Sequence, residues 1–523
     1  MANLEWILAL LLGAVLLAAL ARRIGVPSPA LLALGGAAIA FIPNGPRFSL
    51  DPNLALALFV APVLLDAAFD SSLRDLKANW VPLTSLILIA VGVTTSAVAL
   101  AARWLVPAMP WSVAVTLGAL VAPPDAAAAT AVLKEVRLPH RLLVILEGES
   151  LLNDASALLI YRLAVGAAVA HAGPTLGVAS TLTLVLGGSI AVGVLAAFGF
   201  GEIVNRFSDA PSSIIMQFIG TFGVWMLADR LHLSGVLAIV ACAVILSRRA
   251  PLRMPAAVRV PSYAVWETVV FLLNALAFVL VGLQIGPILD RVGSAQRFQM
   301  LTFAATVMLT VILARIGWVM IYNRSLWLLN LIPGGRVTRW LTTPPFKRSI
   351  VVAWCGMRGL VTLAAALALP DGSGGGAAFP YRDLIVLTAF SVVLGTLVIQ
   401  GLTLRPLLLA LGLDDDGAID NEARIGREEM FKAAIDSLGE QETDVAVALR
   451  REYGEFLGRV DGSREISPQA RQTEVALRAG ARASARERLT YLRRMGVIGD
   501  SAFQQLEAEL DMFELETEAR SRW

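Results

Sequence analysis

The feature that most constrains this chain is a succession of apolar stretches, separated by short polar loops, that continues up to Leu413. A bilayer core of about 30 Å is crossed by about 20 mostly apolar helical residues. Because a helix bonds its own backbone groups, it can cross lipid where an irregular chain cannot. The pattern predicts an all-α polytopic membrane protein of roughly thirteen helices. The predicted spans are residues 4–21, 29–42, 53–69, 80–106, 111–133, 141–170, 175–204, 212–228, 234–247, 261–285, 299–322, 349–369 and 383–411.

The composition agrees with a membrane location. Hydrophobic residues make up 57% of the chain, charged residues only 16%, and the mean hydropathy is +0.70. A water-soluble fold with these values would expose large apolar patches. The net charge of +2 gives no basic excess that would indicate a nucleic-acid partner. The expected surroundings are therefore the lipid bilayer.

Basic residues test the predicted topology, because cytoplasmic loops collect Lys and Arg. One alternating set of loops holds Arg22, Arg23, Arg74, Lys77, Lys134, Arg137, Arg141, Arg206, Arg248, Arg249, Arg253, Arg259, Arg336, Arg339, Lys347 and Arg348. The other set holds only Arg47, Arg103, Arg230, Arg291, Arg297 and Arg382. This asymmetry predicts an external amino terminus and a cytoplasmic carboxyl end.

The sequence changes character after the last apolar stretch. Residues 414–523 are charged and show helical patterning, for example over 428–457 and 483–513, with a break expected near 462–468. We therefore predict a transmembrane domain over 1–413 and a cytosolic helical tail over 414–523. Because the charges in the tail are mixed in sign, solvated helices that pack on each other are favoured over a ligand site.

Ionisable residues inside apolar runs are candidates for function, because they are costly at membrane depth unless paired or hydrated. The predicted spans contain five acids and two arginines of this kind. They are Asp66, Asp125, Glu147, Glu149, Asp154, Arg162 and Arg358. Since two arginines cannot neutralise five acids, at least one carboxylate should be free to titrate.

The sixth span carries the strongest candidate site. Ser150 and Asp154 are four residues apart and share a helix face, and Asn153 is adjacent. A hydroxyl, an amide and a carboxylate supply the oxygen ligands that an alkali cation accepts. Desolvation raises the pKa of a carboxyl group and an incoming cation lowers it. Competition of a cation and a proton for Asp154 would amount to exchange, provided that the site opens alternately to each side.

Two spans look like broken helices. Pro123 and Pro124 remove backbone donors in the fifth span, and Gly356 and Gly359 flank Arg358 in the twelfth. Corresponding breaks in two halves are typical of inverted repeats with a midplane site. Asp125 is then expected near a half-helix amino terminus and Arg358 near carbonyl ends, where each opposes a helix dipole.

These residues resemble the monovalent cation/proton antiporters of the first cation-proton antiporter group, the NhaP-type exchangers. The resemblance is carried by LEGESLLNDASAL, WCGMRGLVTLAAALALP, LLNALAFVLVGLQ, LHLSGVLAIV and the segment from FVAPVLLDAAF through LRDLKANW. It covers nearly the whole membrane part and little of the tail. It implies thirteen helices in two inverted repeats with crossed broken helices, a homodimer, elevator-like alternating access and a multi-pass location in the bacterial inner membrane.

The resemblance also implies roles for particular residues. Asp154 would bind Na⁺ and H⁺ by turns, with Asn153 and Ser150 as further ligands of the transported cation. A single aspartate in this pair implies electroneutral exchange. Arg358 and Glu149 would form a structural ion pair.

The sequence departs from the family pattern at two places. The crossing segment usually reads Thr-Asp-Pro, whereas here it is Pro124, Asp125 and Ala126, so a threonine ligand is missing. The acid of the third span, commonly glutamate, is Asp66, which is one methylene shorter and is a second candidate for the ion site.

The sequence also bears on two alternative functions, a membrane-embedded enzyme and a cation channel. A membrane-embedded enzyme is disfavoured, because the three histidines fall at loop positions and no zinc-protease or nucleotide-binding motif accompanies them, so no cofactor is expected. A passive cation channel would need repeated coordination sites along a pore, and the chain offers one compact cluster. The cation remains open among Na⁺, Li⁺ and K⁺, because cavity size and hydration select among them. A K⁺/H⁺ antiporter is thus the nearest alternative to a Na⁺/H⁺ antiporter.

Overall fold

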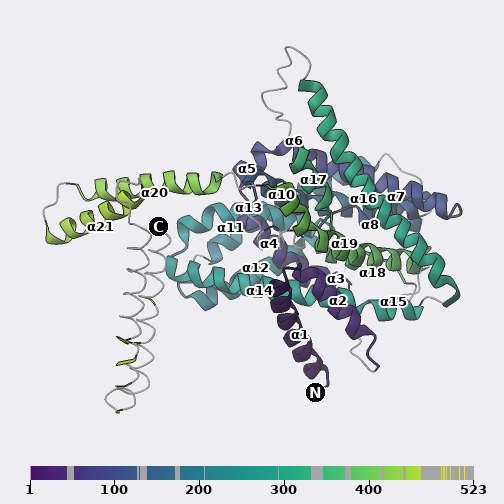
Figure 1. Ribbon diagram of the computed structural model, residues 1–523, viewed down its shortest axis with the longest axis horizontal. Helices are drawn as coiled ribbons and strands as arrows, with labels where there is room; N and C mark the ends of the chain where they lie inside the picture. Colours follow the sequence, from purple (N-terminus) through teal and green to yellow (C-terminus); the bar gives the residue numbers. More distant parts are fainter. Residues whose placement is uncertain are drawn as a thin grey trace. The chain divides into compact units, whose positions relative to one another are not determined.

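The computed structural model describes most of the chain (Figure 1). It covers residues 2–43, 52–125, 129, 133, 138–170, 177–204, 206–291, 294–330, 346–371, 378–413, 417–439 and 443–460, with scattered residues between 484 and 512. Within these ranges the regular structure is helical and contains no strand. The chain forms two compact units, Met1–Asp416 and Gly417–Trp523. Each unit is described by itself.

The first unit contains the apolar helices. In chain order they are α1 (Ala2–Ile24), α2 (Ser28–Ala40), α3 (Pro52–Ala55), η1 (Leu56–Val60), α4 (Ala61–Asp70), α5 (Leu73–Ala78), α6 (Trp80–Thr84), η2 (Ser85–Ala90), α7 (Val91–Leu105), α8 (Trp111–Val121), α10 (His140–Ala170), α11 (Gly177–Val204), α12 (Ala210–Arg230), α13 (Gly235–Arg253), α14 (Ala256–Leu283), α15 (Ile285–Arg291), α16 (Ser294–Asn330), α17 (Phe346–Trp354), α18 (Leu360–Leu367) and α19 (Arg382–Leu411). The segments η1 and η2 are π-helical turns inside longer helices.

These helices confirm an all-α polytopic membrane fold. Seven helices among the described residues are long and apolar enough to cross a bilayer, and α2 and α8 are shorter apolar helices. The total of thirteen spans stays a prediction.

Several predicted spans differ from the helices in detail. The fifth is interrupted, because α8 stops at Val121 just before the proline pair and helical structure is found again at Ala129 and Leu133. The twelfth is divided into α17 and α18. Two short helices were not predicted. Ser72 caps α5 by accepting a hydrogen bond from the Asp75 amide, and α15 follows α14 directly. Residues 372–376, for which the sequence suggests a flexible loop, lie outside the described residues.

Helices α2 and α14 pack closely enough for their backbones to touch. A β-carbon added to Gly36 would overlap the Val279 carbonyl, and one added to Gly282 would overlap backbone atoms of Ala33 and Ala37. Small residues allow membrane helices to approach in this way, and the gain in packing drives their association. The glycines therefore fix the spacing of this helix pair.

We expect Gly282→Ala to lower the thermal stability of the purified protein. The added methyl group meets backbone that cannot rotate away, and overpacking of this kind costs about 1–3 kcal/mol. Gly317→Ala in α16 is the matched control, because a β-carbon there meets nothing within 4 Å. The melting temperature in detergent is the measurement. Equal melting temperatures for the two variants would contradict the close α2–α14 contact.

The second unit contains α20 (Ala418–Ser437) and α21 (Asp444–Val460), which pack on each other. Phe431 is buried and stacks on Phe456 with ring centroids 5.4 Å apart. Gly439, at φ +52°, ends the first helix, so the helical pattern over 428–457 belongs to two helices rather than one. The predicted helix over 483–513 falls almost entirely outside the described residues.

Candidate functional site

Two interrupted helices meet in the first unit. After α8 the chain runs through Pro123 and Pro124 without helical structure, and residues 355–359 between α17 and α18 are also non-helical. The amide of Asp125 donates a hydrogen bond of 2.7 Å to the carbonyl of Met357, which joins the two breaks. Non-helical backbone inside a membrane needs hydrogen-bond partners from the protein, because lipid tails supply none. The broken segments expected from the sequence are therefore present and in contact.

Arg358 is bound by carbonyl oxygens. Its Nε donates to the Val121 carbonyl at 2.9 Å, its second terminal nitrogen donates to the Ala122 carbonyl at 3.2 Å, and its first donates to the Gly356 carbonyl. The side chain is fully buried. Val121 ends α8, so the guanidinium group lies at the negative carboxyl end of that helix, where a cation is favourable.

Asp125 lies at the opposite kind of helix end. A β-carbon added to Gly359 would overlap the Asp125 carboxylate, and Gly359 is the residue that precedes α18. The carboxylate therefore occupies the space beside the amino terminus of α18, where negative charge is favourable. A side chain at position 359 would displace it.

The predicted ion pair between Glu149 and Arg358 is wrong. Glu149 instead binds Arg315 of α16, with terminal nitrogens 2.5 and 2.8 Å from its two carboxylate oxygens. Arg315 also donates to the Val352 carbonyl of α17, and both charged side chains are no more than 3% exposed. The physical reason is that the guanidinium group of Arg358 already donates to carbonyl groups of the two breaks, whereas the guanidinium group of Arg315 reaches both carboxylate oxygens of Glu149.

Asn153 anchors α10 (His140–Ala170) to the first break. Its Nδ2 donates to the Pro124 carbonyl at 3.0 Å, which supplies a donor to one of the groups that the proline pair exposes. The side chain is completely buried. Its Oδ1 has no hydrogen-bond partner in the described part of the chain.

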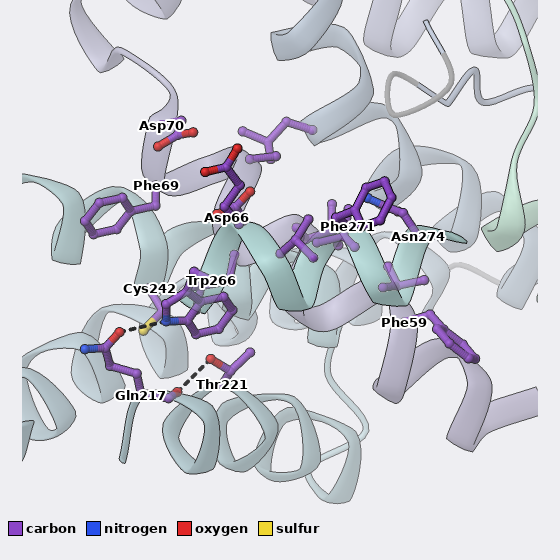
Figure 2. A pocket seen from close by; sticks show the side chains of 18 of the residues that line it. Phe59, Asp66, Phe69, Asp70, Gln217, Thr221, Cys242, Trp266, Phe271 and Asn274 are labelled. Atoms are coloured by element: carbon purple, nitrogen blue, oxygen red, sulfur yellow. Dashed lines mark hydrogen bonds between the residues drawn. The ribbon is translucent and has the colours of Figure 1, made fainter. Parts of the chain in front are cut away.

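A cavity of about 780 Å³ adjoins these residues (Figure 2). It brings together five of the predicted site residues, from α4, the first break and α10: Asp66, Pro124, Asp125, Ser150 and Asp154. Asn153 is not among its lining residues. Figure 2 shows Asp66 and Asp70 on one side, apart from the Trp266 indole, which donates to Gln217 at 2.7 Å.

Asp154 is the carboxylate with the least compensation in this group. It is 8% exposed, and no basic side chain of the described ranges forms an ion pair with it. The nearby Asp125 carboxylate interacts with it unfavourably. A buried carboxylate that faces a cavity in this way needs a proton or a cation.

Two other predicted charged residues are exposed. Glu147 is exposed at the cavity lining, and Arg162 is exposed and donates to the Leu233 carbonyl at 3.4 Å. Neither is therefore an intramembrane charge enclosed by protein. By the resemblance, Pro124 stands where a threonine ligand is usual, and Ala126, which stands in place of the following proline, lies outside the described residues.

Comparison with known proteins decides the family. The family model described as "Sodium/hydrogen exchanger, transmembrane" matches residues 7–410. The chain belongs to the sodium/hydrogen exchanger family. An uncharacterized Na⁺/H⁺ exchanger of Mycobacterium tuberculosis is 32% identical to it over 98% of this chain and 95% of that protein. A sodium, potassium, lithium and rubidium/H⁺ antiporter of Bacillus pumilus is 28% identical over 82% of this chain and 65% of that protein.

The fold agrees with that of a solved exchanger. The sodium proton antiporter MjNhaP1 of Methanocaldococcus jannaschii, at pH 8, has a TM-score of 0.58 and 20% identity, and the match covers 79% of this chain and all of that one. Together these findings make the chain a membrane transporter for cation/proton antiport. The enzyme alternative has no support in them.

Sequence reasoning missed Arg315 of this exchanger. The residue stands in the middle of the apolar run LTVILARIGWVM, which is the same signal that singled out Arg358. It could have been found by applying that criterion to the eleventh predicted span. Thr396 was also missed. Its hydroxyl accepts a hydrogen bond of 3.0 Å from the Arg358 amide, and a hydroxyl within an apolar helix carries no comparable signal.

We expect Arg315→Met to destabilise the exchanger by about 3–5 kcal/mol, because Glu149 is left as a buried charge without a partner. The double variant Arg315→Met with Glu149→Leu should recover at least half of the loss, since neither charge then remains. Thermal unfolding in detergent is the measurement.

Arg324→Met is the matched control for this experiment. Arg324 lies on the same helix, is exposed and stacks on Trp327, so its removal should change stability little. A double variant no more stable than Arg315→Met alone would mean that the Glu149–Arg315 pair is not the source of the loss.

Proposed function

We propose that this exchanger carries Na⁺ against H⁺ by alternate binding of the two ions at the Asp154 carboxylate. The observation that carries the proposal is the combination of burial, cavity access and absence of an ion-pair partner among the described residues at Asp154. A carboxylate held in a permanent salt bridge could not exchange ligands. One that faces water and lacks a partner can release either ion.

The cation ligands in this proposal are oxygens of α10. Asp154 provides a carboxylate, and Ser150 lines the same cavity one turn earlier. Asn153, the residue before Asp154, has an amide oxygen without a hydrogen-bond partner in the described part of the chain. Because Nδ2 of Asn153 is held by the Pro124 carbonyl, the orientation of its Oδ1 is fixed. Hard oxygen ligands of this kind suit an alkali cation. Asp66, across the cavity, is a second-rank candidate that would act on the ion through water.

The structural partners of the other buried acids favour electroneutral exchange. Glu149 is paired with Arg315, and Asp125 faces the amino terminus of α18. If Asp154 is the only group that exchanges Na⁺ for H⁺, it carries one Na⁺ across the membrane in one direction and one H⁺ in the other. The charge that moves is then the same in both directions. No net current then flows.

We also propose an orientation and an assembly. The cavity wall includes Arg249, Arg253 and Arg259, which belong to the loops rich in basic residues, so the cavity would open to the cytoplasm in this conformation. The amino terminus would be outside and residues 414–523 cytosolic, in a bacterial inner membrane. A homodimer is expected from the family resemblance alone.

The site could accept more than one alkali cation. The Bacillus pumilus relative is named for sodium, potassium, lithium and rubidium, so K⁺/H⁺ exchange is the second candidate. Both candidates use the same carboxylate. They differ in the size and hydration of the ion that the site accepts.

We expect Asp154→Asn to reduce exchange below a tenth of the wild-type rate, because an amide binds neither a proton nor a cation as a carboxylate does. Proteoliposomes with an imposed pH gradient and a trapped pH dye measure its collapse on addition of NaCl, KCl or LiCl. Glu147→Gln is the matched control, since it removes an exposed carboxylate from the same helix and cavity. Exchange that persists in Asp154→Asn would refute the assigned role.

A second measurement separates an antiporter from a channel and tests the stoichiometry. The initial rate of Na⁺-driven proton movement should be unchanged when a membrane potential of either sign is imposed, because one charge replaces one charge. A rate that rises with potential in one direction would exclude one-for-one exchange. Sodium entry that proceeds at full rate without proton movement would indicate a channel.

A further inference from the structure

A second cavity, of about 150 Å³, lies apart from the ion site. Three basic side chains line it: Lys77 of α5, Arg141 of α10 and Arg348 of α17. Tyr322 of α16 adds a hydroxyl group. No Asp or Glu is found among the described residues of this lining. Three cations around so small a space repel one another unless an anion lies between them.

Helix ends add to the positive potential of this cavity. Arg141 is the second residue of α10 and Arg348 the third of α17, so the first turns of both helices border the cavity. The amides of a first turn lack carbonyl partners inside the helix and favour anions. Figure 1 shows α5, α6, α10 and α17 gathered in one region, where α10 contacts each of the other three and α5 contacts α6.

The acid closest in sequence to Lys77 already has other hydrogen-bond partners. Asp75, on the same short helix as Lys77, accepts hydrogen bonds from His140 at 3.0 Å and from Arg74 at 3.2 Å. Arg141 is oriented by its Nε, which donates to the Asn79 side chain at 2.8 Å. Lys77 and Arg348 form no ion pair with any described residue. Among the described residues, Lys77 and Arg348 therefore have no acidic partner, and the lining that they share with Arg141 contains no acid.

The level of the cavity in the membrane indicates the source of the anion. One apolar span begins at Trp80 and another ends at Leu328, and the cavity lies where these two ends meet. Trp80 lines it and is 63% exposed, as is typical of tryptophan at a membrane interface. All three cations belong to the loops rich in basic residues. An anion at this level, beside exposed indole and apolar side chains, belongs to a lipid.

We propose that this cavity binds the phosphate headgroup of an anionic phospholipid. The headgroup contacts Lys77, Arg141 and Arg348, and the acyl chains extend along Trp80 and the apolar surface beside it. Basic pockets between transmembrane helices on the cytoplasmic side bind such headgroups. Arg141 lies on α10, the helix that carries Asp154, so the lipid braces the ion-site helix against α16 and α17.

The experiment compares lipids on the purified full-length exchanger in detergent. Dioleoylphosphatidylglycerol should raise the melting temperature, and dioleoylphosphatidylcholine should not. Native mass spectrometry should show retained phosphatidylglycerol. In Lys77→Gln/Arg348→Gln the apparent affinity should fall about thirtyfold, since each basic residue near an anionic surface contributes about fivefold.

Arg248→Gln/Arg324→Gln is the matched control, because it removes two exposed arginines that do not line the cavity. It should bind phosphatidylglycerol as the wild type does. Should the double cavity variant fail to fold, Lys77→Gln alone replaces an exposed lysine and should lose about fivefold.

Two results would overturn the proposal. One is an equal loss of phosphatidylglycerol binding in the cavity and control variants, which would mean that net charge alone attracts the lipid. The other is an equal rise in melting temperature with glycerol 3-phosphate, which would make the ligand a free phosphate compound.

Discussion

The structure depends on how it satisfies backbone that is not helical at membrane depth. Prolines at 123 and 124 stop α8, and the carbonyls at its end would be costly without donors. Arg358 supplies those donors from the opposite break, and Asp125 donates its amide back to Met357. Each break thus provides what the other lacks. Neither broken segment is stable at this depth without its counterpart.

This arrangement also distributes charge. Arg358 is committed to carbonyls, Asp125 to the amino terminus of α18, and Glu149 to Arg315. Every one of these charges is fixed to a structural partner. Asp154, one helical turn and a residue beyond Glu149, has no such partner among the described residues. The ion binding that we propose needs a charge of this kind, because a carboxylate fixed to a structural partner could not exchange ligands.

The sequence was sufficient to predict the two helix breaks but not how the buried charges pair. Prolines and charges within apolar runs are visible in a linear chain because they violate the requirements of the bilayer. Both breaks were predicted in this way, and the ion site on α10 stays a prediction. Pairing depends on which helices adjoin, and Glu149 and Arg315 are 166 positions apart. The prediction that Arg358 pairs with Glu149 was wrong because backbone carbonyls bind Arg358. Every residue carries a carbonyl, so the sequence does not indicate which carbonyls will bind a side chain.

The buried contacts of Arg315 and Asn153 limit how the helices can move relative to one another. Arg315 ties α10 to α16 and, through the Val352 carbonyl, to α17, while Asn153 ties α10 to the first break. In the alternating access that we propose, a motion that turns Asp154 from one side of the membrane to the other would either rupture these buried contacts or carry all of these helices together. Rupture would expose a buried ion pair, which costs several kcal/mol. The less costly path moves α8, α10, α16 and α17 as one body.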